Sequence, residues 1–278
     1  MLFDRFYKIG KSIIFYIGLV MLFLLILGPI LWLFLNSFKT NVDALAIPPQ
    51  IFFKPIFSNY PEVIRGFDFP KAFSNSIIIT ILSTIIVLVL GLPAAYVLAR
   101  FRFTGSVILA FIILATRMVP RVAIGIPTYL IMMKLDLLDT YLALIFSYVA
   151  YNLPFGIWLL IGFIKLIPKE IEEAAAIDGC SRWSSFGYVI VPLIKPGLAA
   201  VGTLVWIVCW REFFLPLILT SSQAKPLSVL AGQFITEYGI DWGQLAAFSI
   251  ITFIPVFIIA IYVQRYLISG LTMGAVKD

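Results

Sequence analysis

The sequence predicts an all-α integral membrane protein with six transmembrane helices and no second domain. Of its 278 residues, 62% are hydrophobic and 12% are charged, and the mean hydropathy is +1.07. A soluble globular domain is only about half apolar. A helix needs roughly 17 to 25 mostly apolar residues to cross the hydrocarbon core with its backbone groups paired. Six runs satisfy this requirement and place the expected spans at about 13–35, 75–99, 107–130, 141–164, 190–219 and 242–267.

The six runs support their spans in different ways. The first follows a basic N-terminal segment and lacks a small-residue cleavage site, so we expect it to stay as a helix. The runs at 75–99, 141–164 and 242–264 contain no charged residue at all. The other two contain charges but are otherwise apolar enough to span. These charges are Arg117 and Arg121 in the run 107–130, and Arg211 and Glu212 in the run 196–219.

The basic residues of the loops predict that the N- and C-termini are both cytoplasmic. Cytoplasmic loops retain Lys and Arg, and an inside N-terminus places eleven such residues inside and six outside. The inside set is Arg5, Lys8, Lys11, Arg100, Arg102, Lys165, Lys169, Arg182, Lys195, Arg265 and Lys277. The outside set is Lys39, Lys54, Arg65, Lys71, Lys134 and Lys225.

Composition also excludes several classes of function. Histidine is absent, and with it the usual neutral-pH acid/base residue and commonest metal ligand. Cys180 and Cys209 fit neither a metal site nor a disulfide framework, so we expect both to be structural. The basic residues are scattered, which argues against nucleic acid as a partner. No G-x-x-x-x-G-K-[ST] loop occurs, so we expect this chain not to bind ATP itself. We also expect it to hold no metal or other cofactor.

The segment 167–179 is typical of a short cytoplasmic helix. Pro168 suits the first helical position, and acidic residues in the next turns complement the helix dipole. Gly179 is placed to end the helix in a left-handed conformation. A narrow face of small side chains would let a partner approach closely, although a plain surface helix is an equal alternative. The residues concerned are Glu170, Ile171, Glu172, Glu173, Ala174, Ala175 and Asp178.

The same segment carries a longer motif. Glu173-Ala174-Ala175, three residues, Gly179, nine residues and then Val189-Ile190-Val191-Pro192 resemble the EAA signature of ABC-importer permeases, which reads EAA, x3, G, x9, I-x-L-P. Only the two valines depart from that pattern. Further stretches resemble the carbohydrate-uptake branch, in which the maltose-type second permease is found. They are 173–179, 210–213, 241–243 and 264–277.

The resemblance implies a type I ABC importer permease fold, formed by residues 1–278 as one domain, with a coupling helix inside the cytoplasmic EAA loop 165–189. The chain would be a multi-pass protein of the plasma (inner) membrane of a prokaryote and a non-catalytic subunit. Its implied partners are a second homologous permease, two ATP-binding subunits that use ATP and Mg, an extracytoplasmic solute-binding protein and membrane lipid. The residues expected to couple to the ATPase are Glu170, Glu172, Glu173, Ala174, Ala175, Asp178 and Gly179.

Charges inside expected spans are costly and are candidates for function. One hypothesis is that the arginines line the solute path and favour an anionic or heavily hydroxylated solute through forked hydrogen bonds. The alternative is that they pair with Glu212 or with acids of a partner subunit, or extend toward an interface. The related permeases usually have Asn where this chain has Arg211. The candidates for the path are Arg117, Arg121, Tyr151, Asn152, Trp210, Arg211 and Glu212.

Three other classes of membrane protein compete with the permease. A membrane-embedded enzyme would need clustered acidic or nucleophilic residues, which the apolar runs lack. A channel or a secondary transporter would not need an EAA loop. The solute implied by the resemblance is a disaccharide, oligosaccharide or polyol, with glycerol phosphate or another anionic sugar derivative as the alternative.

Overall fold

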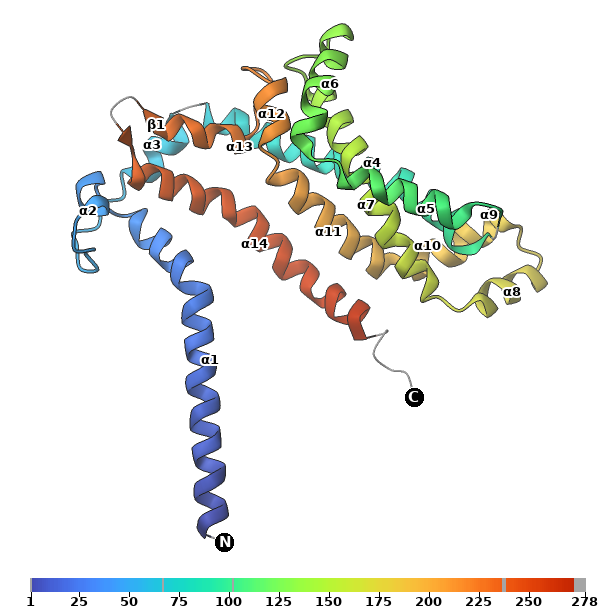
Figure 1. Cartoon of the computed structure of the whole chain (residues 1–278), viewed down its shortest axis with the longest axis horizontal. Helices are drawn as coiled ribbons and strands as arrows, with labels where there is room; N and C mark the ends of the chain where they lie inside the picture. The colour runs from blue at the N-terminus through green and yellow to red at the C-terminus, as the bar shows by residue number, and fades with distance from the viewer. Residues whose placement is uncertain (1, 67, 102, 237–238, 273–278) are drawn as a thin grey trace. The chain divides into compact units, whose positions relative to one another are not determined.

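The computed structural model describes residues 2–66, 68–101, 103–236 and 239–272, and most of them are helical (Figure 1). Two compact units are present, one formed by Met1–Asp68 with Ala231–Ile254 and the other by Phe69–Leu230 with Pro255–Asp278. The long helices are α1 (Leu2–Asn36), α4 (Phe69–Arg100), α5 (Ser106–Ala115), α6 (Arg121–Lys134), α7 (Tyr141–Lys165), α11 (Lys195–Trp210) and α14 (Trp242–Thr272). The short elements are α2 (Asn41–Leu45), α3 (Asn59–Arg65), η1 (Thr116–Met118), α8 (Lys169–Ile177), α9 (Arg182–Ser185), η2 (Phe186–Ile190), α10 (Val191–Leu193), α12 (Phe214–Leu219), α13 (Leu227–Leu230), η3 (Ala231–Phe234) and the paired strands β1 (Ile235–Thr236) and β2 (Gly239–Ile240).

Four helices of the described residues are long and apolar enough to cross a membrane, and two bent helix pairs bring the number to as many as six. The four single helices cover Phe15–Asn36, Phe69–Arg100, Tyr141–Lys165 and Trp242–Gln264. They correspond to the uncharged runs of the sequence. The bent pairs are Ser106–Met118 with Arg121–Lys134 and Arg182–Leu193 with Lys195–Trp210, with bends of 90° and 72°.

The run at 107–130 forms two helices with a 90° bend between them, and together they are apolar enough to be one broken span. The break follows from Pro120, because a proline disfavours helical backbone at the residue before it. Val119 is indeed extended, with φ −67° and ψ 124°, and α6 begins at Arg121. Both arginines of this run therefore lie at the break, since Arg117 is in η1 and Arg121 opens α6.

The run at 190–219 also departs from a single helix. It contains a bend before Lys195 and a second break at 211–213, between α11 and α12. Arg211 caps the C-terminus of α11, and Glu212 lies in the break itself. The charged residues that interrupt these two runs in the sequence thus lie where the helices end.

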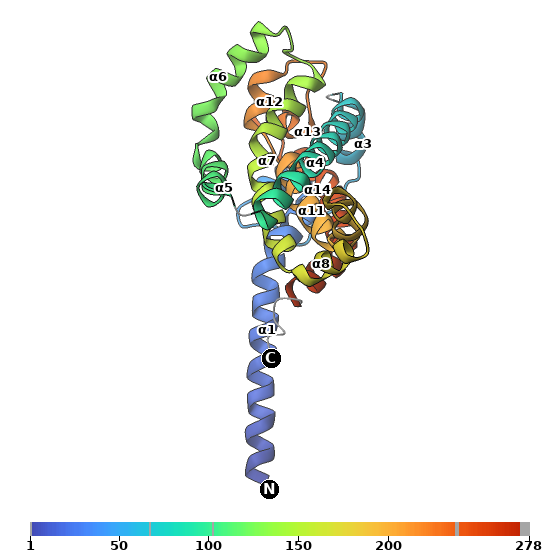
Figure 2. The same ribbon diagram turned by 90° about the vertical axis from the view of Figure 1, so that its right-hand side faces the viewer.

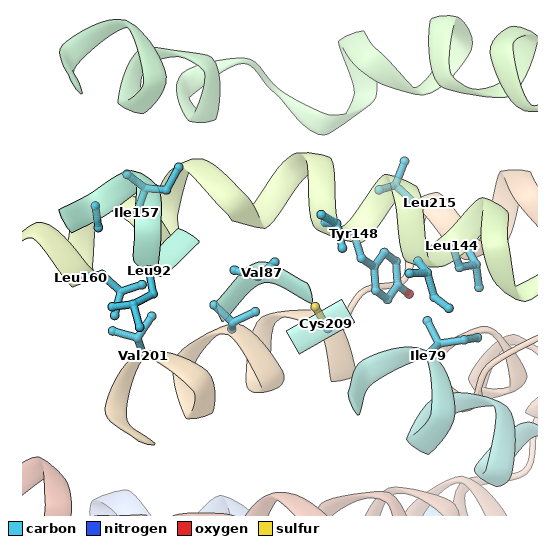
Figure 3. Close-up of a cluster of buried hydrophobic side chains, with 14 of the residues drawn as sticks. Ile79, Val87, Leu92, Leu144, Tyr148, Ile157, Leu160, Val201, Cys209 and Leu215 are labelled. Atoms are coloured by element: carbon cyan, nitrogen blue, oxygen red, sulfur yellow. The ribbon is translucent and has the colours of Figure 1, made fainter. Parts of the chain in front are cut away.

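Helices α4, α7 and α11 form the core of the second unit, and α12 packs against one end of α7 (Figure 3). Ile79 and Val87 of α4, Leu160 of α7 and Val201 of α11 are among its fully buried side chains. Close contact between α4 and α7 depends on Gly156, where an added Cβ would lie 2.8 Å from Cγ1 of Val87. Helices α5 and α6 lie along one side of α7 (Figure 2).

Polar side chains fix the N-terminal end of α4 to the segment before α13. Asn75 donates from Nδ2 to the carbonyl oxygens of Gln223 and Lys225, at 2.9 Å each, and its Oδ1 accepts from Tyr141. Ser76 accepts a 2.8 Å hydrogen bond from the backbone N–H of Leu227. This end of α4 is therefore anchored by several buried or half-buried hydrogen bonds.

Asp139, just before α7, is surrounded by hydrogen-bond donors from the segment 221–224. Its carboxylate accepts from the backbone N–H groups of Ser221, Ser222, Gln223 and Ala224 and from both serine hydroxyls. Partial burial by itself raises the pKa of Asp139, but these hydrogen bonds outweigh it and hold the pKa well below its ordinary value. Asp139 thus joins the connection before α7 to the connection after α12.

Lys39 is the largest fully buried side chain of the first unit. Its Nζ lies 4.1 Å from the ring centroid of Trp32 and 5.0 Å from that of Phe53, and has no hydrogen-bond partner among the described residues. Burial lowers the pKa of Lys39, and the charge of Asp43 opposes this shift. The backbone carbonyl of Lys39 accepts from Asn59, so the end of α1 is tied to α3.

Candidate functional site

The acid-capped segment of the EAA loop forms the helix α8, at Lys169–Ile177. Pro168 stands at its N-cap, with φ −57° and ψ 138°, one position earlier than expected. Gly179 has a φ of +90°, which confirms the left-handed conformation predicted for it. The backbone N–H of Cys180 closes the helix end on the carbonyl of Ala175, at 2.9 Å.

One face of α8 is fixed to the C-terminal end of α4. Glu172 accepts from Nε of Arg100 at 2.5 Å and from the hydroxyl of Tyr96 at 2.8 Å. Arg100 also donates to the carbonyl oxygen of Ile167 at 2.7 Å, in the turn before α8. The Arg100 and Glu172 side chains are only 7% and 15% exposed, so this ion pair is well shielded from solvent. Glu172 therefore holds α8 on α4.

The other face of α8 is free within the described residues. Glu170, Glu173, Ala174 and Ile177 recur at intervals of three and four and are all exposed, and Ile177 is 87% exposed. Asp178 and Gly179 continue this exposed surface, and Ala175 is half-buried. The sequence hypothesis missed Ile177, although an isoleucine at the C-terminal end of a polar helix is itself a signal for a partner.

A second cluster of functional candidates lies where the two interrupted runs meet. Arg121, at the start of α6, forms an ion pair with Glu212, in the break between α11 and α12. Glu212 is buried, and its Oε1 also accepts from the backbone N–H of Leu215 at 3.3 Å, so it caps the N-terminus of α12. One carboxylate therefore joins both breaks.

Arg117 reaches the same place from η1. Its Nη1 donates to the backbone carbonyl of Tyr151 and to Oδ1 of Asn152, at 2.9 Å each. Its guanidinium lies 4.4 Å from the ring centroid of Tyr151 and 4.9 Å from that of Phe155, within the range of cation–π attraction. Arg121 lies 4.4 Å from the same Tyr151 ring. The guanidinium groups of Arg117 and Arg121 thus both contact the ring of Tyr151.

Asn152 continues the network into the core, because its Nδ2 donates to the carbonyl of Tyr148 and to Sγ of Cys209. An apolar hollow of about 430 Å³ adjoins this cluster between α6, α7 and α12, with Thr116, Tyr151, Ser147 and Leu215 in its wall. Of the seven predicted path residues, the structure brings together Arg117, Arg121, Tyr151, Asn152 and Glu212.

The other two path candidates directly precede Glu212 in the chain, and their own surroundings differ. Trp210 is buried in the second unit, where its ring stacks on Trp206 at 4.9 Å and meets Phe73 edge-on. It therefore serves packing within this chain. Arg211, the next residue, is exposed and within electrostatic range of Arg117, and its side chain forms no hydrogen bond or ion pair among the described residues.

Long apolar helices, two helix pairs broken at charged residues and an exposed acid-capped helix are features of a membrane subunit of a transport system. The chain belongs to the family of binding-protein-dependent transport system inner membrane components, whose family model matches residues 88–272. The expected resemblance to ABC-importer permeases is confirmed. Membership also separates the chain from channels and secondary transporters.

Relatives and a solved structure cover almost the whole chain. A probable ABC transporter permease of Sinorhizobium fredii is 40% identical over 253 residues, which are 90% of each chain. The trehalose/maltose transport system permease protein MalG of Thermococcus litoralis is 34% identical over 97% of this chain and 98% of its own. A chain of a bacterial ABC transporter involved in the import of the acidic polysaccharide alginate has a TM-score of 0.76 and 27% identity, covering 95% and 97% of the two chains. These matches show that the type I ABC importer permease fold is that of this chain.

Proposed function

We propose that this chain forms half of the translocation path of an ATP-driven, binding-protein-dependent sugar importer and transmits ATPase movement to that path through α8. Family membership supports the importer, and the named relatives that carry trehalose, maltose or alginate support a carbohydrate as solute. A second permease would supply the other half of the path. Two ATP-binding subunits, with ATP and Mg, would supply the energy, and a solute-binding protein would deliver the sugar.

The observation that carries the proposal is the two-faced character of α8. Its Glu172 face is held on α4 by a shielded ion pair, and its Glu170–Ile177 face is exposed and combines acidic, small and apolar side chains. A helix joined to its own bundle on one side and open on the other can transmit the movement of a docked partner. Each state of the transporter would then be favoured only through contacts that differ between states.

A matched pair of substitutions on α8 tests the docking face. Ala174 and Ala176 are both exposed on the same helix, but Ala176 lies one turn after Glu172, on the side of α4. Ala174→Asp should abolish co-purification of the ATP-binding subunits with the permease, because a buried unpaired carboxylate in the interface is costly. Ala176→Asp should retain them. Equal retention by both variants would show that α8 does not dock through this face.

A further inference from the structure

The cluster at the two breaks carries more positive charge than the described residues neutralise. Three arginines, Arg117, Arg121 and Arg211, are present with Glu212, and only Arg121 is paired with it. Glu212 is the sole acidic side chain that contacts these arginines among the residues the structure describes. Arg117 is held by neutral oxygens, and Arg211 is exposed. Two positive charges therefore have no counter-ion among the residues that the structure describes.

The depth of the cluster makes this excess significant. Tyr151 and Asn152, which Arg117 contacts, lie near the middle of the 25 residues of α7, so the cluster lies near mid-membrane when α7 spans. Uncompensated charge at that depth is costly unless it faces a water-filled cavity or an opposite charge. Helix breaks at membrane depth are likewise tolerated only where they are covered by protein or line such a cavity.

The chemistry of the free groups indicates what they would bind. Nη1 of Arg117 is occupied, but the rest of its planar fork and all of the Arg211 guanidinium remain available among the described residues. Guanidinium groups form forked hydrogen bonds with carboxylate, sulfonate or phosphate oxygens. A neutral sugar hydroxyl would satisfy the donors but would leave both charges in place.

We propose that Arg117 and Arg211 form an anion subsite in the path, and that the transported carbohydrate carries an acidic group. This inference rests on the proposed function, because the subsite is defined as part of a sugar path. A lipid headgroup is disfavoured as the occupant, since headgroups lie at the membrane surface and this cluster lies near mid-span. Acids of the partner permease are the other source of negative charge, and the experiment separates them from the solute.

The test measures uptake by cells that express the complete transporter with its own binding protein. The labelled probes are trehalose and maltose as neutral sugars, with digalacturonate, glycerol 3-phosphate and sulfoquinovosyl glycerol as acidic ones. We expect at least one acidic probe to be carried. Arg117→Gln and Arg211→Gln should each lower that uptake by about tenfold or more, the loss expected for one charge-assisted hydrogen bond. Arg65→Gln, an exposed arginine on α3, should leave uptake unchanged.

Assembly of each variant is measured alongside uptake, by co-purification of the partner permease and ATP-binding subunits. Arg211→Lys keeps the charge and should retain much more acidic uptake than Arg211→Gln. Import of neutral sugars alone would overturn the anion subsite but leave the proposed function standing. A complex that Arg211→Gln dissociates and Arg211→Lys restores would assign the charge to a partner acid and overturn the subsite. Carriage of no carbohydrate at all would overturn both proposals.

Discussion

Lys39 is a charged side chain that is fully buried, so the energetic role of its stem and its charge must be considered separately. Among the described residues, its Nζ lies over the faces of Trp32 and Phe53, with the charge of Asp43 as a further favourable influence. Rings of this kind attract a cation by about 0.5 to 2 kcal/mol. Removal of water from an ammonium group costs more than that in an apolar site. We infer that the aliphatic stem of Lys39, more than its charge, holds the end of α1 in place.

A pair of substitutions separates the stem of Lys39 from its charge. Lys39→Met keeps an unbranched stem and removes the desolvated charge, so the melting temperature Tm of the detergent-solubilised protein should stay the same or rise. Lys39→Ala should lower stability by about 2 to 4 kcal/mol, because it leaves a cavity next to Trp32. A large loss of Tm in Lys39→Met would show that the ammonium group itself is stabilising.

Asp139 predicts a defined dependence of stability on pH. The folded-state pKa of Asp139 lies below its unfolded value, so its contribution to stability is complete above about pH 4 and is lost as the pH falls toward the folded-state pKa. Asp139→Asn should lower Tm at pH 7, because an amide cannot accept from all the donors of 221–224. The difference in Tm between wild type and variant should shrink below pH 4. A constant difference from pH 7 to pH 3 would contradict this assignment.

The sequence could predict which residues are charged at membrane depth but not which of them meet. The sequence leaves the arginines either lining the path, or pairing with Glu212 or with acids of a partner subunit, or extending toward an interface. The structure shows Arg121 paired with Glu212. The contacts of Glu172 with Arg100 and Tyr96 were missed, because they join residues more than 70 positions apart and no local pattern records them. Gly179 was predictable, since its conformation depends only on its own lack of a side chain.

At the scale of elements, the ion pair between α4 and α8 should affect coupling more than docking. Glu172→Gln removes the charge that Arg100 needs and should lower sugar uptake by about tenfold, in line with the loss of one charged hydrogen bond. The ATP-binding subunits should still co-purify, because the exposed face of α8 is unchanged. Glu173→Gln provides the comparison, since Glu173 is exposed and its loss should weaken docking.

The double variant Arg100→Gln/Glu172→Gln completes this experiment. If the two residues act as a pair, the double variant should be little worse than either single one. Additive losses of uptake would mean that Glu172 acts independently of Arg100, and the proposed junction would then be wrong.

The contact between α4 and α7 gives a second prediction at this scale. Gly156→Ala should lower Tm, with a loss of about 1 to 3 kcal/mol from overpacking against Val87. Gly162→Ala is a matched control on the same helix, where an added Cβ meets nothing within 4 Å, and should be neutral or slightly stabilising. Equal values of Tm for the two variants would show that the interface of α4 and α7 accommodates the added Cβ without loss of stability.

The helices themselves were predictable to the extent that hydropathy decides them. The uncharged runs form single helices although each contains one proline, which membrane helices tolerate. These prolines are Pro29, Pro93, Pro154 and Pro255. Hydropathy predicts one span over 107–130 and does not register the local change of direction, because it averages over a window of residues. Pro120 directly before Arg121 was the available signal, since it disfavours helix at Val119. The bend before Lys195 has a similar signal in Pro196, at the start of α11.

At the scale of the whole molecule, chemical labelling of the two native cysteines can test the proposed membrane topology. Cys180 follows α8 and is partly exposed, whereas Cys209 is only 2% exposed in the core. If the EAA loop is cytoplasmic, a membrane-impermeant maleimide should label inside-out vesicles stripped of ATP-binding subunits, and should not label intact spheroplasts. Cys180→Ser should abolish the label, and Cys209→Ser should not. Labelling of spheroplasts at Cys180 would reverse the proposed orientation.

Anchors at both ends of α4 give this helix the properties of a lever. Its 32 residues have a length of about 48 Å at 1.5 Å per residue. Glu172 acts at one end through Arg100, and Asn75 and Ser76 act at the other on the segment 223–227. If α4 moves as a rigid body about its end at Arg100, a tilt of about ten degrees displaces the far end by about 8 Å, given that length. A small rotation imposed on α8 would thus become a large movement at the opposite end of α4.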